Sequence, residues 1–207
     1  MFSSTLGVIN VEHPEVIVCN TTELTYFDHD ICVIPELIFQ PSFSFSELLN
    51  SLSFDRKFKS GRQTKLFGIL PYHYGTVSHI PSSFSDNRFV CEIFDFVNDN
   101  FPLIDLNSCL INYYPDNSSS IPDHSDDERH IAENSFIVTI SLGSSRRIFF
   151  KDINSSSCLC SVKLIDGSVL LFSKRSQFLF THGIPSTRSR DADDYSPRIS
   201  ATFRALI

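Results

Sequence analysis

The chain has 207 residues, a length that fits a single domain with a full hydrophobic core. Hydrophobic residues make up 42% of it, which is ordinary for a globular protein, and the formal net charge of −7 argues against a strong general nucleic-acid binder. The N-terminus lacks a basic region followed by an apolar block, and no apolar run is long enough to span a membrane, so we expect neither secretion nor a membrane span.

The first expected elements are two helices. Residues 1–28 show no strong period, and we interpret them as a leader or a segment at a domain edge. Ser44 followed by Glu47 is typical of a helix start, and apolar residues at helical spacing continue to Leu52. The same spacing predicts a second helix over residues 85–97.

A basic cluster lies between the two expected helices. It consists of Arg56, Lys57, Lys59, Arg62 and Lys65. A solvated turn and a row of phosphate contacts explain this cluster about equally well.

From Cys109 onward the pattern changes to short strands separated by polar breaks. We expect strands at residues 110–114, 136–140, 147–150, 159–162, 169–172, 177–180 and 199–203. Many short strands with few helices predict a mainly β (α+β) fold of the sandwich or jelly-roll kind.

The six cysteines of the chain are scattered and contain no Cys-x-x-Cys pair. A zinc knuckle is therefore not indicated. We expect reduced thiols and an intracellular location, cytoplasmic or nuclear.

The most informative motif is His124-Ser125-Asp126 together with the later His182. His124 and Asp126 are two residues apart, so on an extended strand their side chains share one face. Two histidines and one carboxylate can occupy one face of an Fe(II) ion and leave other positions open. Arg198, sixteen residues past His182, suits a dicarboxylate because a guanidinium binds carboxylate oxygens in two parallel bonds. Taken alone, each part also fits a surface or core residue.

In order and spacing, the chain resembles the AlkB-like Fe(II)- and 2-oxoglutarate-dependent dioxygenases over roughly its last two-thirds. The matching stretches are residues 110–116, 121–128, 138–143, 167–171, 182–185 and 198–204, with a weaker match at 67–74. The resemblance implies a double-stranded β-helix, with residues 29–107 as an N-terminal extension and substrate lid and residues 108–207 as the catalytic core. It also implies Fe(II) and 2-oxoglutarate. The RNA-virus replicases are one known setting of such a domain.

The resemblance further implies roles for individual residues. The metal ligands would be His124, Asp126 and His182. The 2-oxoglutarate site would consist of Asn112, Tyr114, Arg198, Ser200 and Arg204. Arg204 would also brace Asp127, and Ser200 stands where the family usually has Asn.

The substrate implied by the family is an N-alkylated base, of the 1-methyladenine or 3-methylcytosine type, which loses its methyl group as formaldehyde. Asp127 would contact the exocyclic amine in the reaction site, and Tyr72 or Tyr74 would lie against the flipped base. The segment between Phe54 and Lys65 is too short for the duplex-opening hairpin of some relatives, so single-stranded RNA or DNA is the expected partner. If the basic cluster binds phosphates, the contacts would come from Lys57, Lys59, Arg62 and Lys65.

Two alternatives stay open at this point. A dioxygenase of the same chemistry acting on a protein or a small molecule would suit the net acidic charge. A non-catalytic binding module would keep the fold only, but it has no physical need for the triad and both arginines.

Overall fold

The computed structural model describes residues 7–8, 17–18, 31–74, 77–187 and 197–207. The expected leader, residues 1–28, lies outside this range except for two short strands, β1 (Gly7–Val8) and β2 (Ile17–Val18). Among the described residues, no helix is long and apolar enough to cross a membrane.

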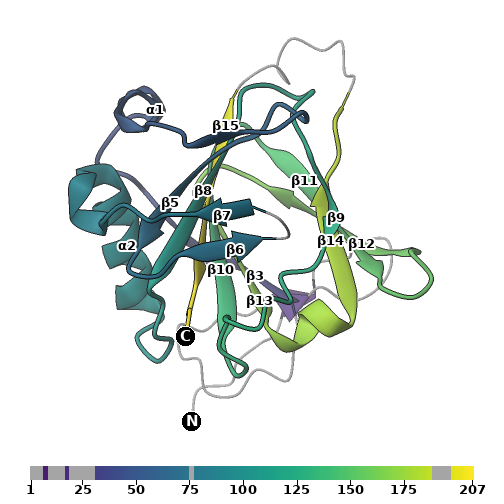
Figure 1. The fold of residues 1–207 in the computed structure, drawn as a ribbon. Helices are drawn as coiled ribbons and strands as arrows, with labels where there is room; N and C mark the ends of the chain where they lie inside the picture. Colours follow the sequence, from purple (N-terminus) through teal and green to yellow (C-terminus); the bar gives the residue numbers. More distant parts are fainter. Residues whose placement is uncertain (1–6, 9–16, 19–30, 75–76, 188–196) are drawn as a thin grey trace.

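Two β-sheets form the body of the molecule, and nearly all of their neighbouring strands are antiparallel (Figure 1). The large sheet has the order β1-β2-β3-β13-β10-β15-β8-β5-β4, the small sheet has the order β12-β11-β14-β9, and β6 and β7 form a separate hairpin. The remaining bounds are β3 (Ile31–Ile38), β4 (Arg56–Lys57), β5 (Gln63–Gly68), β6 (Tyr72–Tyr74), β7 (Val77–His79), β8 (Ser108–Tyr114), β9 (Ile121–His124), β10 (Phe136–Gly143), β11 (Arg146–Asp152), β12 (Cys158–Leu164), β13 (Ser168–Ser173), β14 (Phe180–Ile184) and β15 (Arg198–Arg204). The expected mainly β, jelly-roll architecture is confirmed.

The two expected helices are α1 (Phe45–Ser51) and α2 (Arg88–Asn100). Ser44 caps α1 in the expected capping box with Glu47. The start expected for the second helix falls in a short 3-10 turn, η1 (Phe84–Asp86), and α2 itself begins after the N-cap Asn87. Both helices lie against the outer side of the large sheet (Figure 1), where their apolar faces bury one core cluster.

Strand alternation divides the large sheet into a helix side and a site side. On β15, Ile199, Ala201 and Phe203 belong to the core under the helices. The intervening positions, from Arg198 to Arg204, face the space between the two sheets because successive side chains of a strand point to opposite faces. A second apolar cluster, which includes Tyr114, Ile148 and Phe150, joins the sheets there.

One expected strand was wrong in detail, and the strand geometry considered for His124 and Asp126 does not hold. Residues 177–180 do not form one strand, because a 3-10 turn, η2 (Arg175–Phe178), precedes β14. Strand β9 ends at His124, so Asp126 lies in the following loop and not on the strand. Local apolar periodicity cannot distinguish such short irregular segments from strands.

Candidate active site

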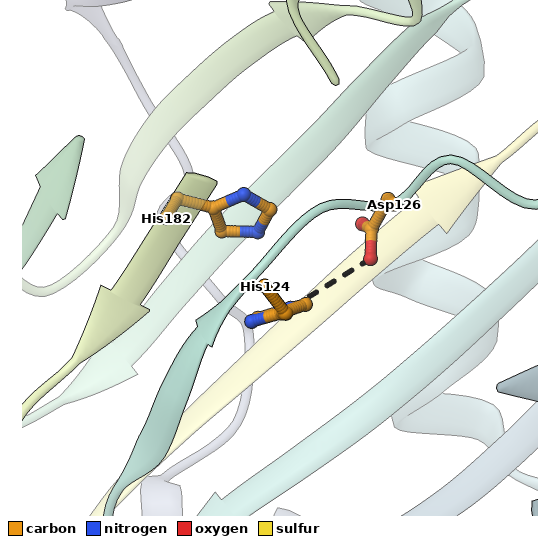
Figure 2. Close-up of side chains that lie close together, drawn as sticks. All are labelled: His124, Asp126 and His182. Atoms are coloured by element: carbon orange, nitrogen blue, oxygen red, sulfur yellow. Dashed lines mark ion pairs between the residues drawn. The ribbon is translucent and has the colours of Figure 1, made fainter. Parts of the chain in front are cut away.

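Two histidines face each other across neighbouring strands of the small sheet. His124 ends β9 and His182 lies in β14, directly opposite it in the antiparallel register. Their ring centroids are 4.3 Å apart (Figure 2). Burial and the neighbouring His124 lower the pKa of His182 to about 3, and burial also lowers the pKa of His124. Both rings are therefore neutral near pH 7, the form in which imidazole binds a metal ion.

Asp126 completes the group from the loop after β9 (Figure 2). The candidate ligand atoms of His124, Asp126 and His182 all lie within 4.8 Å of one another. His124 has its Nδ1 2.8 Å from the carbonyl oxygen of Pro122, which leaves Nε2, 3.7 Å from Asp126 Oδ1, on the side of the group. Two imidazoles and one carboxylate fit Fe(II) and leave other coordination positions open.

Arg204 holds the carboxylate of Asp126 in its ionised form. Its Nη2 donates to Asp126 Oδ2 at 2.5 Å, and both side chains are buried. Burial by itself acts to raise the pKa of Asp126, but Arg204, together with the two histidines once they are protonated at low pH, outweighs it and holds that pKa well below its usual range. Arg204 was expected to brace Asp127, and this was wrong: Asp127 is exposed, and the guanidinium pairs with Asp126.

A second buried arginine, Arg198, has N–H groups without a hydrogen-bond partner among the described residues. Arg198 is 1% exposed and donates from Nη2 to Ser141 Oγ at 2.8 Å. Its Nε and Nη1 have no hydrogen-bond partner among the described residues. Burial lowers the pKa of Arg198 to about 10, so it stays charged at neutral pH. A buried, charged donor with open N–H groups fits an anionic ligand such as a carboxylate.

The other expected cosubstrate residues surround Arg198. In the β15–β8 register Arg198 is opposite Tyr114, and Ser200 is opposite Asn112. Alternation places all four side chains on one face, where they line a pocket of ≈ 670 Å³, including its open mouth. The triad and Arg204 line the same pocket. The residues present therefore fit a metal ion beside a dicarboxylate.

Comparison with known families identifies this arrangement. Residues 60–204 match the family described as the 2OG-Fe(II) oxygenase superfamily, and this range contains the triad and both arginines.

The chain belongs to the 2OG-Fe(II) oxygenase superfamily.

Fe(II) and 2-oxoglutarate are accordingly its cofactor and cosubstrate, as expected.

Similarity to individual proteins points to the AlkB-like group, which confirms the expected resemblance. The human protein described as DNA oxidative demethylase ALKBH2 is 32% identical over 109 residues, which cover 49% of this chain and 40% of that protein. The Mus musculus protein of the same description is 29% identical over 109 residues, covering 49% and 44%. The chain thus spans less than half the length of these relatives.

A solved structure titled "The structure of OsALKBH1" supports the fold. It superimposes with a TM-score of 0.57 over 87% of this chain and 100% of that chain. Only 16% of the aligned residues are identical, so this likeness concerns the fold alone.

The basic residues between Arg56 and Lys65 do not form one continuous exposed surface in this oxygenase. Arg62 is 5% exposed and lines the pocket, where its Nη1 donates to Asn112 Oδ1 at 2.5 Å and its guanidinium lies 4.2 Å from the Phe58 ring. Lys57 and Lys59 are exposed, and Lys65 pairs with Asp55 at 3.1 Å. Arg62 therefore does not belong to an exposed row of phosphate contacts, because the alternation of side chains at the start of β5 turns it inward.

Two tyrosines, Tyr72 and Tyr74, were expected to contact the nucleobase, and the structure describes the side chain of Tyr72 only. Tyr72 is 1% exposed, lines the pocket and has the Arg204 guanidinium 4.9 Å from its ring centroid. It also makes an edge-on contact with the His130 ring, at 5.4 Å between centroids. Tyr72 thus packs against the arginine that holds Asp126. The side chain of Tyr74 lies outside the described residues.

His79 is a pocket residue of the oxygenase that the sequence motifs did not indicate. It is opposite Tyr72 in the β6–β7 hairpin, is 3% exposed and lines the pocket. Its Nδ1 has no hydrogen-bond partner among the described residues. Alternation along residues 72–79 would have placed His79 on the same side as Tyr72, but only once the hairpin register was known.

Proposed function

We propose that this oxygenase removes methyl groups oxidatively from N-alkylated bases, of the 1-methyladenine or 3-methylcytosine type, in single-stranded RNA or DNA. The oxidative part of this proposal is carried by one observation: the triad lines the same pocket as Arg198, whose Nε and Nη1 have no hydrogen-bond partner among the described residues. The nucleic-acid part is supported by the similarity to proteins described as DNA oxidative demethylases.

With Fe(II) and 2-oxoglutarate bound, the site would support an oxidation in which 2-oxoglutarate and O2 yield succinate and CO2. One atom of O2 would enter succinate and the other would hydroxylate the N-methyl carbon, which then leaves as formaldehyde. In this proposal Arg198, with Tyr114, would bind a carboxylate of 2-oxoglutarate, because Arg198 lines the pocket and its Nε and Nη1 have no hydrogen-bond partner among the described residues. Arg204 keeps Asp126 ionised as a metal ligand.

The remaining residues would act on the substrate. Asp127, exposed directly after the triad carboxylate, would contact the exocyclic amine of the flipped base. Tyr72 and Tyr74 lie on the β6–β7 hairpin, which we propose as part of a lid within residues 29–107 over the core formed by residues 108–207. Lys57 and Lys59 would contact phosphates from the exposed β4–β5 hairpin. The intracellular location stays a prediction.

The direct test is a demethylation assay. The Fe(II)-loaded protein is incubated with 2-oxoglutarate and a panel of oligonucleotides that carry 1-methyladenine or 3-methylcytosine, as RNA and DNA, single- and double-stranded. Loss of the methyl mass and release of succinate are measured together. We expect turnover on single strands, and none with His182→Ala or Asp126→Ala, which should stay folded because the β core does not depend on them.

The assay also decides between this proposal and its alternative. Formation of succinate by the protein alone, with no loss of methyl mass on any oligonucleotide, would favour a protein or small-molecule substrate, which the net charge of −7 also suits. Normal succinate formation by His182→Ala would overturn the metal assignment itself.

A further inference from the structure

Two buried polar side chains outside the triad bind the main chain of Asp126. Lys174 and Gln177 are 1% and 2% exposed, and both belong to the η2 segment between β13 and β14. Neither has a role in the function proposed above. Burying such groups is costly unless their hydrogen bonds are satisfied, so their partners indicate what they do.

Gln177 holds the main-chain N–H of Asp126. This N–H donates to Gln177 Oε1 at 2.9 Å. The other end of the amide is also engaged, since Nε2 donates to Ser176 Oγ at 2.8 Å and to Ser173 O at 3.3 Å. The amide is therefore held in one orientation, with its oxygen toward Asp126.

Lys174 holds the carbonyl side of the same residue. Its Nζ donates to the carbonyl oxygens of Asp126 at 3.2 Å and Glu128 at 2.9 Å. Its own main-chain N–H donates to Ser135 O at 2.9 Å. The ammonium group thus joins the loop after β9 to the end of β13.

The position of Asp126 in the fold explains why these contacts matter. Because β9 ends at His124, the main chain of Asp126 lies beyond the ladder of the small sheet. The metal ligand His182, by contrast, lies within β14, the strand that follows η2 directly. The η2 segment therefore ties the loop that carries one ligand to the strand that carries another.

We propose that Lys174 and Gln177 are positioning residues that hold the main chain of Asp126 so that its carboxylate is set for the metal ion. Groups that orient metal ligands commonly account for a factor of about 10 to 100 in metal affinity. The inference depends on the metal site but not on the nucleic-acid substrate.

The test uses metal affinity, without any substrate. The metal-free full chain is titrated with Mn(II) by calorimetry, and the Co(II)-loaded protein is examined by its visible absorption spectrum. The variants are Gln177→Met, which keeps length and charge but removes the acceptor, and Lys174→Met. The matched control is Asn87→Leu, since Asn87 is also a buried amide (7% exposed) that donates to Ser51 O and accepts from the start of α2.

We expect Gln177→Met and Lys174→Met to weaken Mn(II) binding about 10- to 100-fold and to alter the Co(II) spectrum. Asn87→Leu should lower the thermal midpoint while keeping Mn(II) affinity and the Co(II) spectrum of the wild type. Wild-type affinity and spectrum in folded Gln177→Met would overturn the proposal, as would an equal loss in Asn87→Leu. Because no oligonucleotide is present, a failed demethylation assay would leave this result interpretable.

Discussion

Two buried arginines on β15 have opposite environments. Arg204 is neutralised by Asp126, and its pKa is raised above the usual range in spite of burial. Arg198 lies instead beside the hydroxyl of Ser141 and the face of the Tyr114 ring, whose centroid is 5.3 Å away. A buried arginine that lines a pocket and has N–H groups without a protein partner is suited to an anionic ligand, whereas an arginine paired with a carboxylate stabilises that carboxylate.

We therefore predict that Arg198→Ala weakens 2-oxoglutarate binding at least about 30-fold, because loss of one partner of a buried charged pair costs ~2–5 kcal/mol. Calorimetric titration of the Mn(II)-loaded protein with 2-oxoglutarate measures it. Mn(II) affinity itself should be unchanged. Arg147→Ala, which removes an exposed arginine from β11, is the control. Unchanged 2-oxoglutarate affinity in Arg198→Ala would move the carboxylate site elsewhere.

A pH prediction concerns His79. Burial, together with Arg56 and Arg62, lowers the pKa of His79 below 6.5, and Asp55 opposes this only partly. His79 is therefore neutral in the fold at a pH where the unfolded chain takes up a proton. The stability that it contributes is present above about pH 6.5 and is lost as the pH falls below that value.

Urea unfolding of the metal-free protein at pH 7.5 and 5.5 measures the effect. The loss of unfolding free energy between the two pH values should be smaller in His79→Leu than in the wild type, by no more than about 1.4 kcal/mol. An equal or larger loss in His79→Leu would contradict the assignment.

Among the secondary-structure elements, the hairpin β4–β5 separates residues that are neighbours in sequence. Lys57 and Lys59 point to solvent while Arg62 enters the pocket and binds Asn112. One short hairpin thus combines an exposed basic edge with a wall of the active site. The exposed basic edge and the buried Arg62 should therefore respond differently to substitution.

We predict that the triple variant Arg56→Gln/Lys57→Gln/Lys59→Gln binds methylated single strands more weakly, and by the same factor whatever their base sequence. Its salt dependence should flatten by roughly 0.7 unit of slope for each phosphate that the variant no longer neutralises. Fluorescence anisotropy at several salt concentrations measures both. The control is Arg147→Gln/Lys163→Gln, a cross-strand pair of exposed residues on β11 and β12.

Arg62→Gln should behave differently from the triple variant. It changes the surroundings of Asn112, so its effect should appear in 2-oxoglutarate binding and not in the salt slope. Normal oligonucleotide binding by the triple variant would refute a phosphate role for this hairpin.

In the molecule as a whole, the candidate active site is built from residues of both sheets. The small sheet and its loop contribute His124, Asp126 and His182, and the large sheet contributes Arg198 and Arg204. Ligands that bind both groups should therefore stabilise the entire fold and not one sheet.

We predict that Mn(II) and 2-oxoglutarate together raise the thermal midpoint more than either does alone. At a ligand concentration of about 100 times Kd, binding raises the free energy of unfolding by about 2.7 kcal/mol. Differential scanning fluorimetry measures it, with the unliganded protein as reference. His182→Ala should fold normally and lose the Mn(II)-dependent part. A full shift in that variant would contradict the proposed ligand set.

The two helices, most strands of the core and the identity of the triad could be predicted from the amino-acid sequence. Apolar period, the capping pair Ser44 and Glu47, and motif spacing are local properties, and local properties can be read from the chain. The quartet of Asn112, Tyr114, Arg198 and Ser200 was also predicted as a set, from the resemblance of these motifs to the family.

Only the tertiary structure shows which side chains from distant parts of the chain contact each other. The register of β15 and the end of β9 set Arg204 against Asp126, and the hairpin of β5 turns Arg62 inward. Lys174 and Gln177 reach Asp126 over 48 and 51 residues of chain. No local pattern predicts such contacts, because they depend on where strands end and how distant segments pair.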